Sequence, residues 1–365
     1  MGESQMNEYR PDTISPPGET LRDLLGEMGL SQAELATRMG RPKKTISEIM
    51  NGKAAITTET ALQLEMVLGV PADFWNAREQ NYREYLAREQ QAQELAKQYE
   101  WAKQFPLARM FAHGMVPRVK DRSEQVRLLL TFLGVNAPEQ WSELCSQHAV
   151  SFRKSATFDA DSNALGAWLR AGVVRSGKIE TQDYDKRTFL LALRETRRLT
   201  REEPEVFQPA IQAHCGAAGV AVVFVPQLPK SRVSGATRWL TPNKALIQLS
   251  LRYKTNDHLW FTFFHEAAHI LLHGKRSIFL DTQSHEGRQE EEANRWAADF
   301  LVPPDRFAEL QGWNVYRKAA IRDFAASIGI APGIIVGRLQ HEGMLPRSHC
   351  NDLKVRLEWA TATAA

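Results

Sequence analysis

The amino-acid sequence predicts a mainly α-helical protein with a small β-sheet, an α+β fold in which an all-helical unit comes first. Short helical segments separated by Gly and Pro fill residues 18–78. Two runs with strand character follow at 219–225 and 244–251, and a long apolar helix comes next, at about 257–273. With 365 residues, the chain exceeds the usual domain size of about 100–200 residues, so we expect at least two hydrophobic cores.

The composition is typical of a globular protein, with 43% hydrophobic and 24% charged residues. The net charge of +3 is too small for a polycation, so any contact with nucleic acid must come from a local cluster. The sequence has no signal-peptide core and no apolar run of about 18 residues, and we expect a cytoplasmic protein with no membrane partner. Cys145, Cys215 and Cys350 are widely spaced, which predicts free thiols.

The first half of the chain divides by composition. Residues 1–17 are polar and end in Ser-Pro-Pro, which indicates a flexible arm before the helical unit at 18–78. Residues 79–104 are rich in Glu, Gln, Lys, Arg and Ala and contain no Gly or Pro, so we expect a solvated connecting helix or a dimer arm. Residues 105–204 have helical patterns without any chemical motif, and their role is not predicted.

Two consecutive helices of the first unit suit the major groove of DNA. Ser31 and Glu34 form a predicted capping box at the start of one helix, whose apolar face is expected to turn inward. Ile46, Ile49 and Met50 do the same in the next helix. The outward face of that second helix then carries Lys43, Lys44, Thr45, Ser47 and Glu48.

Charge is concentrated around this second helix. Between residues 38 and 53 there are five basic residues and one acidic residue, Glu48. Positive charge at this place suits contacts with phosphates, which supply much of the affinity for DNA. The alternative is a solvated helix face with no partner.

Residues 17–75 resemble the Xre-type helix-turn-helix of the HigA family of addiction-module antidotes. The resemblance runs without a gap from Pro17-Gly18-Glu19 through Asn51-Gly52-Lys53 to Phe74-Trp75. It implies binding to double-stranded operator DNA, which we expect to involve a homodimer. By motif it assigns a backbone contact to Gln32 and groove contacts to Lys43, Lys44, Thr45 and Ser47.

A zinc-peptidase pattern lies in the long apolar helix, at His265-Glu266-Ala267-Ala268-His269. Two histidines four residues apart lie on one helix face and can bind one metal ion, and a glutamate beside them can act as the general base. The expected metal is Zn²⁺, with His265 and His269 as ligands and Glu266 as the catalytic residue. In the alternative, the histidines are only hydrogen-bonded at the edge of a core.

The third ligand is expected to be a glutamate from the following helix. The sequence does not match the metzincin pattern, because Leu272 and Lys275 stand where that pattern needs glycine and histidine. Among the three adjacent glutamates at 290–292 we favour Glu290, with Glu292 as the second choice. Asn294 would then lie one turn later and hold a ligand imidazole.

HEAAHILLHG followed by EEEANRWAADFLVP resembles the two signatures of the ImmA/IrrE metallopeptidase family, over roughly residues 205–345, which leaves a tail at 346–365. The resemblance implies a zinc-dependent fold with a small sheet beside two active-site helices and, in several members, cleavage of a repressor. The strand at 244–251 would be the edge to which a substrate chain adds. His273 is expected to cap the helix before Gly274 rather than to bind metal, and the helix pair at 319–343 is expected to pack internally.

The sequence therefore predicts a DNA-binding transcriptional regulator with a zinc-dependent endopeptidase that cleaves a repressor or a toxin-system protein. The alternative is a non-catalytic, antitoxin-like transcription factor whose metal domain is a sensor or a structural module. A third possibility is autocleavage within residues 79–104.

Overall fold

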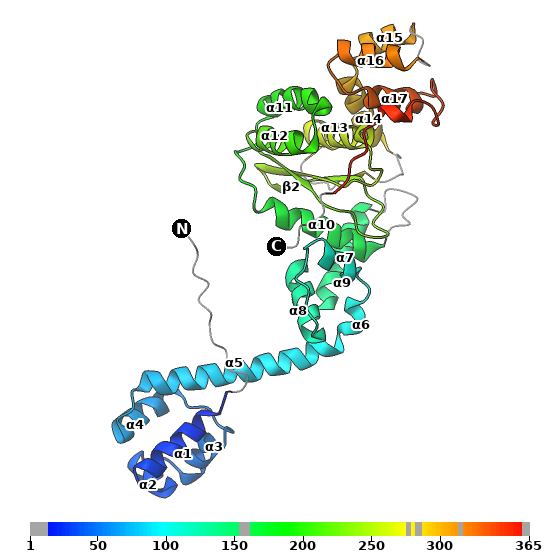
Figure 1. Ribbon diagram of the computed structural model, residues 1–365. Coiled ribbons are helices and arrows are strands. Elements are labelled where there is room, and N and C mark those ends of the chain that lie inside the picture. The colour runs from blue at the N-terminus through cyan, green and yellow to red at the C-terminus, as the bar shows by residue number, and fades with distance from the viewer. Residues whose placement is uncertain (1–13, 153–160, 275–278, 282–286, 313–316, 360–365) are drawn as a thin grey trace. The chain divides into compact units, whose positions relative to one another are not determined.

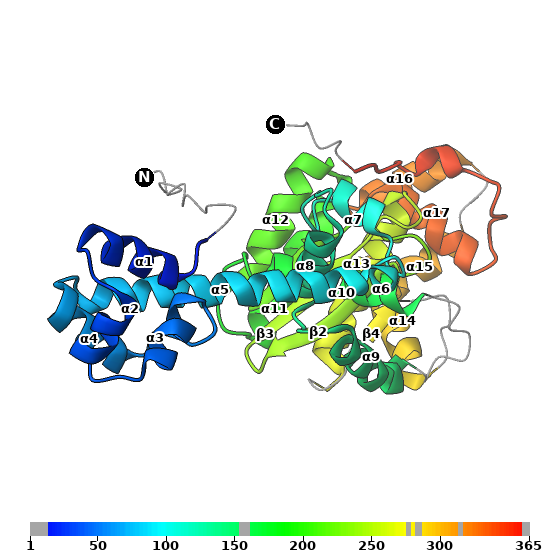
Figure 2. The ribbon, with the colours of Figure 1, turned by 90° about the horizontal axis from the view of Figure 1, so that it is seen from below.

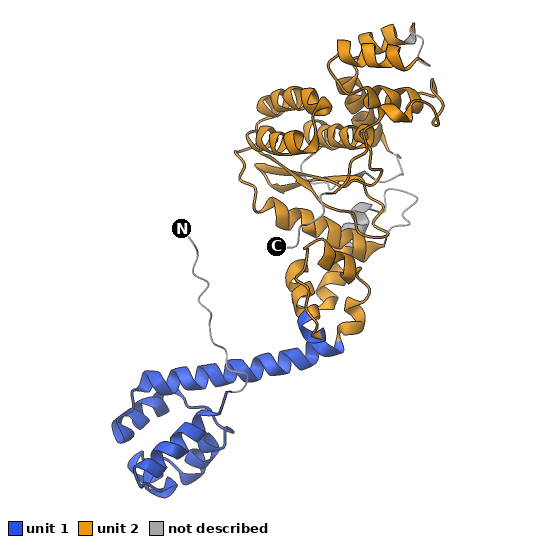
Figure 3. Ribbon diagram, viewed as in Figure 1, with its two compact units in different colours: residues 1–97, 122–124 blue, residues 98–121, 125–365 orange. Residues whose placement is uncertain are grey.

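The computed structural model describes residues 14–152, 161–274, 279–281, 287–312 and 317–359. The chain divides into two compact units, shown in different colours in Figure 3. The first comprises residues 1–97 with 122–124, and the second comprises residues 98–121 with 125–365. Each unit is described by itself below.

The first unit is entirely helical. Its helices are α1 (Pro17–Glu27), α2 (Gln32–Arg38), α3 (Lys43–Met50), α4 (Thr58–Leu68) and α5 (Ala72–Lys97). Leu21, Leu35, Ile46, Leu64 and Trp75 are completely buried and bring all five helices into one core. Burying each of these side chains contributes about 1.5–3 kcal/mol.

The long polar helix differs from its predicted bounds. It was expected at 79–104, but α5 begins at Ala72 and ends at Lys97. Its first turns belong to the first core, because Trp75 is buried there and the Glu79 carboxylate accepts a hydrogen bond from the Ile56 amide at 3.1 Å. A polar composition therefore did not reveal that the helix starts inside the helical unit.

Most of the remaining chain is also helical. The further helices are α6 (Tyr99–Ala102), α7 (Leu107–Ala112), α8 (Arg122–Leu133), α9 (Pro138–Phe152), α10 (Ser162–Ser176), α11 (Lys186–Arg198), α12 (Pro204–Gly216), α13 (Asn256–Leu272), α14 (Arg288–Leu301), α15 (Pro304–Gln311), α16 (Lys318–Ser327) and α17 (Pro332–His341). Among the described residues, no single helix combines the length and hydropathy of a membrane span, and α16 with α17 meets that test only as a pair bent by 111°. The predicted fold class, mainly α with a small sheet, is confirmed.

The sheet has the strand order β1-β3-β2-β4, and Figure 2 labels β3, β2 and β4. Its strands are β1 (Val220–Phe224), β2 (Gly235–Thr241), β3 (Lys244–Leu249) and β4 (Phe279–Asp281). β3 is parallel to β1 and antiparallel to β2, and β4 pairs with the first three residues of β2. The expectation that the strand at 244–251 forms a sheet edge is therefore wrong, because β3 is hydrogen-bonded on both sides.

A buried polar residue explains this error. Gln248 gives β3 its alternating pattern, which suggests one solvated face, yet its side chain is only 1% exposed. Its amide donates to the carbonyl oxygen of Trp168 in α10 at 2.6 Å, so the polar group is satisfied inside the fold. Gly172 provides the space, since a Cβ atom there would overlap the Gln248 side chain.

Helices cover both faces of the sheet. Figure 1 shows α10 on one side and α12 with α13 on the other. Phe189 and Leu193 of α11 are buried in the same core, although the sequence places them in a separate region of unknown role, before residue 205. The hydrophobic core of the second unit thus continues across that expected division.

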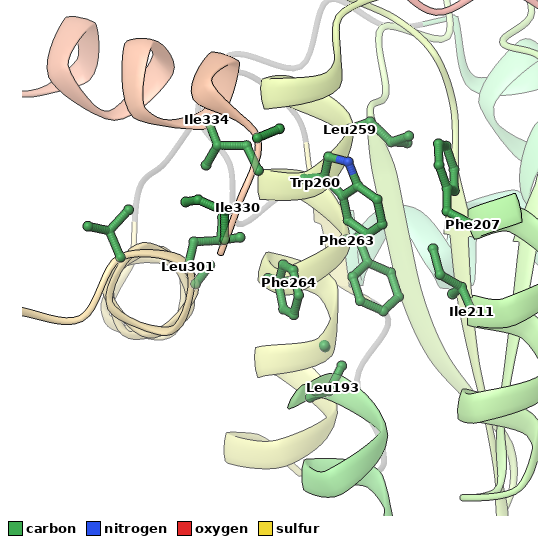
Figure 4. Packing of buried hydrophobic residues seen from close by; sticks show 14 of the residues in the cluster. Leu193, Phe207, Ile211, Leu259, Trp260, Phe263, Phe264, Leu301, Ile330 and Ile334 are labelled. Carbon is green, nitrogen blue, oxygen red and sulfur yellow. The ribbon is translucent and has the colours of Figure 1, made fainter. Parts of the chain in front are cut away.

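Helix α13 lies at the centre of this core (Figure 4). Trp260, Phe263 and Phe264 of α13 are packed among side chains of the surrounding helices, and all three are at most 1% exposed. Ile334 and other apolar residues of the α16–α17 pair join the same cluster, which confirms that the pair packs internally. The helix that carries the two predicted ligands is therefore buried over most of its surface.

Candidate metal centre and nucleic-acid interface

Two packed helices bring three potential ligands together. His265 and His269 lie one turn apart on α13, and Glu290 lies in the first turn of α14. The Nε2 atoms of the two histidines are 3.0 Å apart. The Glu290 carboxylate lies 3.1 Å from His265 Nε2 and 3.5 Å from His269 Nε2. These three residues form the group that could hold a metal ion among the described residues.

The donor set and its spacing fit a zinc-sized ion. Tetrahedral ligands about 2.0–2.1 Å from zinc lie roughly 3.3 Å from one another. The three measured separations, 3.0, 3.1 and 3.5 Å, lie close to that value. Two imidazoles and one carboxylate also leave a coordination position open, as in catalytic rather than structural zinc sites.

Burial and hydrogen bonds shift the pKa values of His269 and Glu290. Desolvation lowers the pKa of His269 from 6.5 to about 4, which keeps its imidazole neutral at physiological pH. Burial alone would raise the pKa of Glu290, but hydrogen bonds from His265 and His269 outweigh it, and the pKa lies well below its usual value. A neutral His269 imidazole beside an ionised Glu290 carboxylate is the combination that binds a cation.

Glu266 is completely buried beside the sheet. A Cβ atom at Gly235, the first residue of β2, would lie 2.7 Å from Glu266 Oε1. The hydroxyl of Thr237 donates to the backbone carbonyl of Glu266 at 3.1 Å. The predicted general base is thus held between α13 and the start of β2.

The predicted DNA-reading face is formed by α3. Lys43 and Lys44 are exposed, and Thr45 and Ser47 are partly exposed, while Ile46 and its apolar neighbours face the core as predicted. The predicted capping box is present, because Ser31 accepts from the Glu34 amide and the Ser31 amide donates to the Glu34 carboxylate.

Gln32 occupies the first position of α2, beside α3. Its amide donates to Met50 Sδ at 2.8 Å, so the side chain lies across the junction between the two helices.

Comparisons with known proteins assign the two units. Residues 215–336 match the peptidase family described as the IrrE N-terminal-like domain. Residues 21–75 match the helix-turn-helix family. The chain therefore combines a helix-turn-helix domain, which implies DNA binding, with an IrrE N-terminal-like domain that contains a possible metal site.

Individual relatives match the first unit. The Escherichia coli (strain K12) protein YddM, an uncharacterized HTH-type transcriptional regulator, is 36% identical over 59 residues, which are 16% of this chain and 63% of YddM. The match thus spans less than two thirds of that regulator. A HigA-family addiction module antidote from Coxiella burnetii is 29% identical over 23% of this chain and 92% of its own, with a TM-score of 0.22. Antitoxin GraA is 28% identical over 23% of this chain and 91% of its own, with a TM-score of 0.22.

Two further predicted residues of the IrrE N-terminal-like domain lie elsewhere. Glu292, the second choice as a ligand, accepts a hydrogen bond from Arg288 at 2.8 Å and lies outside the metal group. Asn294 lines a cavity of about 420 Å³ between α13, α14 and α17, and its buried Oδ1 has no hydrogen-bond partner among the described residues. The structure therefore does not show Asn294 holding a ligand imidazole.

The neighbour of the His269 imidazole is instead His273. Its Nδ1 atom lies 2.9 Å from His269 Nδ1, and its side chain is 3% exposed. His273 also caps α13 as predicted: the helix ends at Leu272, and the His273 backbone amide at the C-cap position donates to the carbonyl oxygen of His269. The regular spacing of residues 265, 269 and 273 was visible in the sequence and could have indicated that all three histidines share one face.

Proposed function

We propose that the chain is a DNA-binding transcriptional regulator whose second unit is a zinc-dependent endopeptidase, acting on a repressor or a toxin-system protein. The observation that carries this proposal is the close group of His265, His269 and Glu290, next to a buried glutamate on the same helix turn. Among the metals these ligands accept, we favour zinc because the spacing and the open position suit it.

Each residue then has one role in peptide hydrolysis. His265, His269 and Glu290 would hold the zinc ion, which supplies Lewis acidity when bound. Glu266 takes the proton of the attacking water and delivers it to the leaving amine. Close packing of α13 against β2 fixes the position of its carboxylate.

The first unit would bring this activity to DNA. We propose that Lys43, Lys44, Thr45 and Ser47 contact the major groove and that Gln32 contacts the backbone, with two copies of the chain on a two-fold operator. Such a regulator would act in the cytoplasm, where operator DNA is accessible.

Zinc content and cleavage together test the peptidase proposal. We expect wild type and Glu266→Gln to hold about one zinc per chain and His265→Ala to lose it. Incubating a cell lysate with each protein and identifying new N-termini by mass spectrometry should reveal products with wild type and none with Glu266→Gln or His265→Ala. Glu291→Gln is a matched control, since Glu291 is exposed on the same helix turn as Glu290. A zinc-free wild type would refute the proposal, and a shortened fragment of the protein itself would indicate autocleavage.

One observation favours the non-catalytic alternative. The backbone of β2 at Gly235–Thr237, next to Glu266, is already paired with β4. If wild type bound zinc but produced no new N-termini, the metal domain would be a sensor or a structural module of a transcription factor.

A further inference from the structure

We infer that His273 is a positioning residue for His269, and that it connects this ligand to Glu292 at the protein surface. This inference rests on the metal site of the proposed function, and on three consecutive contacts. His269 Nδ1 and His273 Nδ1 are 2.9 Å apart, His273 Nε2 and Glu292 Oε2 are 3.4 Å apart, and Arg288 Nε donates to Glu292 Oε1 at 2.8 Å.

His269 determines which atoms donate and which accept in this series of hydrogen bonds. His269 directs Nε2 toward His265 and Glu290, so that atom must be unprotonated when it binds a metal. The proton then resides on Nδ1, which donates to Nδ1 of His273. His273 consequently carries its own proton on Nε2 and donates it to the Glu292 carboxylate. Each nitrogen has a single role, and no two donors oppose each other.

The same geometry excludes His273 as a fourth ligand. It meets His269 at Nδ1, whereas the metal group is built around Nε2 of His269. Its backbone amide donates to the carbonyl oxygen of His269 at 3.1 Å, so the end of the helix is supported by main-chain atoms. The imidazole of His273 is therefore available for the side-chain contact alone.

Packing fixes the ring that receives this hydrogen bond. Phe279 of β4 stacks on His269, with ring centroids 4.1 Å apart and planes inclined by 19°, and its ring centroid is 5.3 Å from that of His273. The exposed fraction of the side chain rises along this series of contacts, from 3% for His273 to 43% for Glu292 and 90% for Arg288. The positioning contact is thus buried, and it ends in a solvated ion pair.

Zinc affinity measured on the full chain tests this role without requiring cleavage. Replacing a hydrogen-bond partner of a metal ligand typically costs about 10–100-fold in affinity. By competition with a chromophoric chelator, we expect His273→Phe to weaken zinc binding by about that factor while one zinc still binds at saturation. His273→Asn, which retains an acceptor, should recover most of the loss, and Glu291→Gln should bind like wild type. Unchanged affinity in His273→Phe, or a loss of stoichiometry like that of His265→Ala, would overturn the inference.

The ring nitrogens of His269 provide a second measurement. In the full chain with ¹⁵N-labelled histidine and bound zinc, the Nδ1 resonance of His269 should shift in His273→Phe and stay unchanged in Glu291→Gln. An Nδ1 resonance that does not respond to His273→Phe would contradict the inference. If wild type bound no zinc, the proposed function would fail, whereas the response of the His269 ring to His273→Phe in the metal-free chain would still test the contact.

Discussion

The Glu266 carboxylate lies against the backbone of Gly235, so closely that a single methyl group at residue 235 would be 2.7 Å from Glu266 Oε1. The same methyl group would also meet the Thr262 side chain at 2.5 Å. The start of β2 thus limits the positions that the Glu266 carboxylate, the proposed general base, can occupy. A strand residue with any side chain would move one of the two elements.

Gly235→Ala should consequently damage function more than metal binding. We expect the free energy of unfolding to fall by about 1–3 kcal/mol, as for overpacked cores, and cleavage to drop sharply while zinc content is kept. Gly274→Ala is the control, since nothing lies within 4 Å of a Cβ atom there. Denaturant titration measures the free energy of unfolding, zinc analysis the metal content, and the N-terminal mass spectrometry described above the cleavage. Wild-type stability in Gly235→Ala would contradict the observed contact.

Lys43 and Lys44 should contribute to DNA binding through charge. Both are exposed on α3, and removing a phosphate contact reduces the dependence of log K on log[salt] by about one per lysine. We expect the double variant Lys43→Ala/Lys44→Ala to bind a fixed duplex more weakly and with a shallower salt dependence. Lys97→Ala, at the end of α5, is the control. An unchanged slope would indicate that α3 does not face DNA.

Acid should destabilise the metal-free protein through His269. Desolvation lowers its pKa to about 4 in the folded state, against 6.5 for an ordinary histidine, so the unfolded chain binds the extra proton between these values. The free energy of unfolding should therefore rise with pH from about 4 to 6.5, by up to about 3 kcal/mol from this group. Chemical denaturation at several pH values should show a flatter dependence in His269→Gln than in the exposed control His349→Gln. Equal slopes would exclude this linkage.

Cys145 and Cys215 should react slowly with alkylating reagents in the folded protein. Burial raises the pKa of Cys215 to about 12 and that of Cys145 to about 11, so both thiols stay protonated at neutral pH. All three cysteines are free, as the sequence predicts. We expect iodoacetamide at pH 8 to modify Cys215 only after denaturation, as followed by mass spectrometry. Rapid alkylation of Cys215 in the native chain would contradict its burial.

The residues predicted well from the sequence are those whose geometry is local. His265 and His269 are placed by helical spacing alone, and the Ser31 capping box by a spacing of three. The partners of β3 and His273 depend instead on tertiary packing. Gln248 appears polar in the sequence, but its hydrogen bond to Trp168 buries it, and His273 meets Glu292 only because α13 packs on α14.

The pairing of β4 with Gly235–Thr237 gives the protein an internal competitor for any chain that approaches Glu266 along β2. A tethered strand acts at an effective concentration of about millimolar, whereas a protein substrate in a cell is far more dilute. An extended segment with only generic backbone affinity would lose that competition. Under the proposed function, a substrate that reaches this stretch of β2 must therefore bring additional contacts of its own, and a peptidase with this strand order would cleave few proteins.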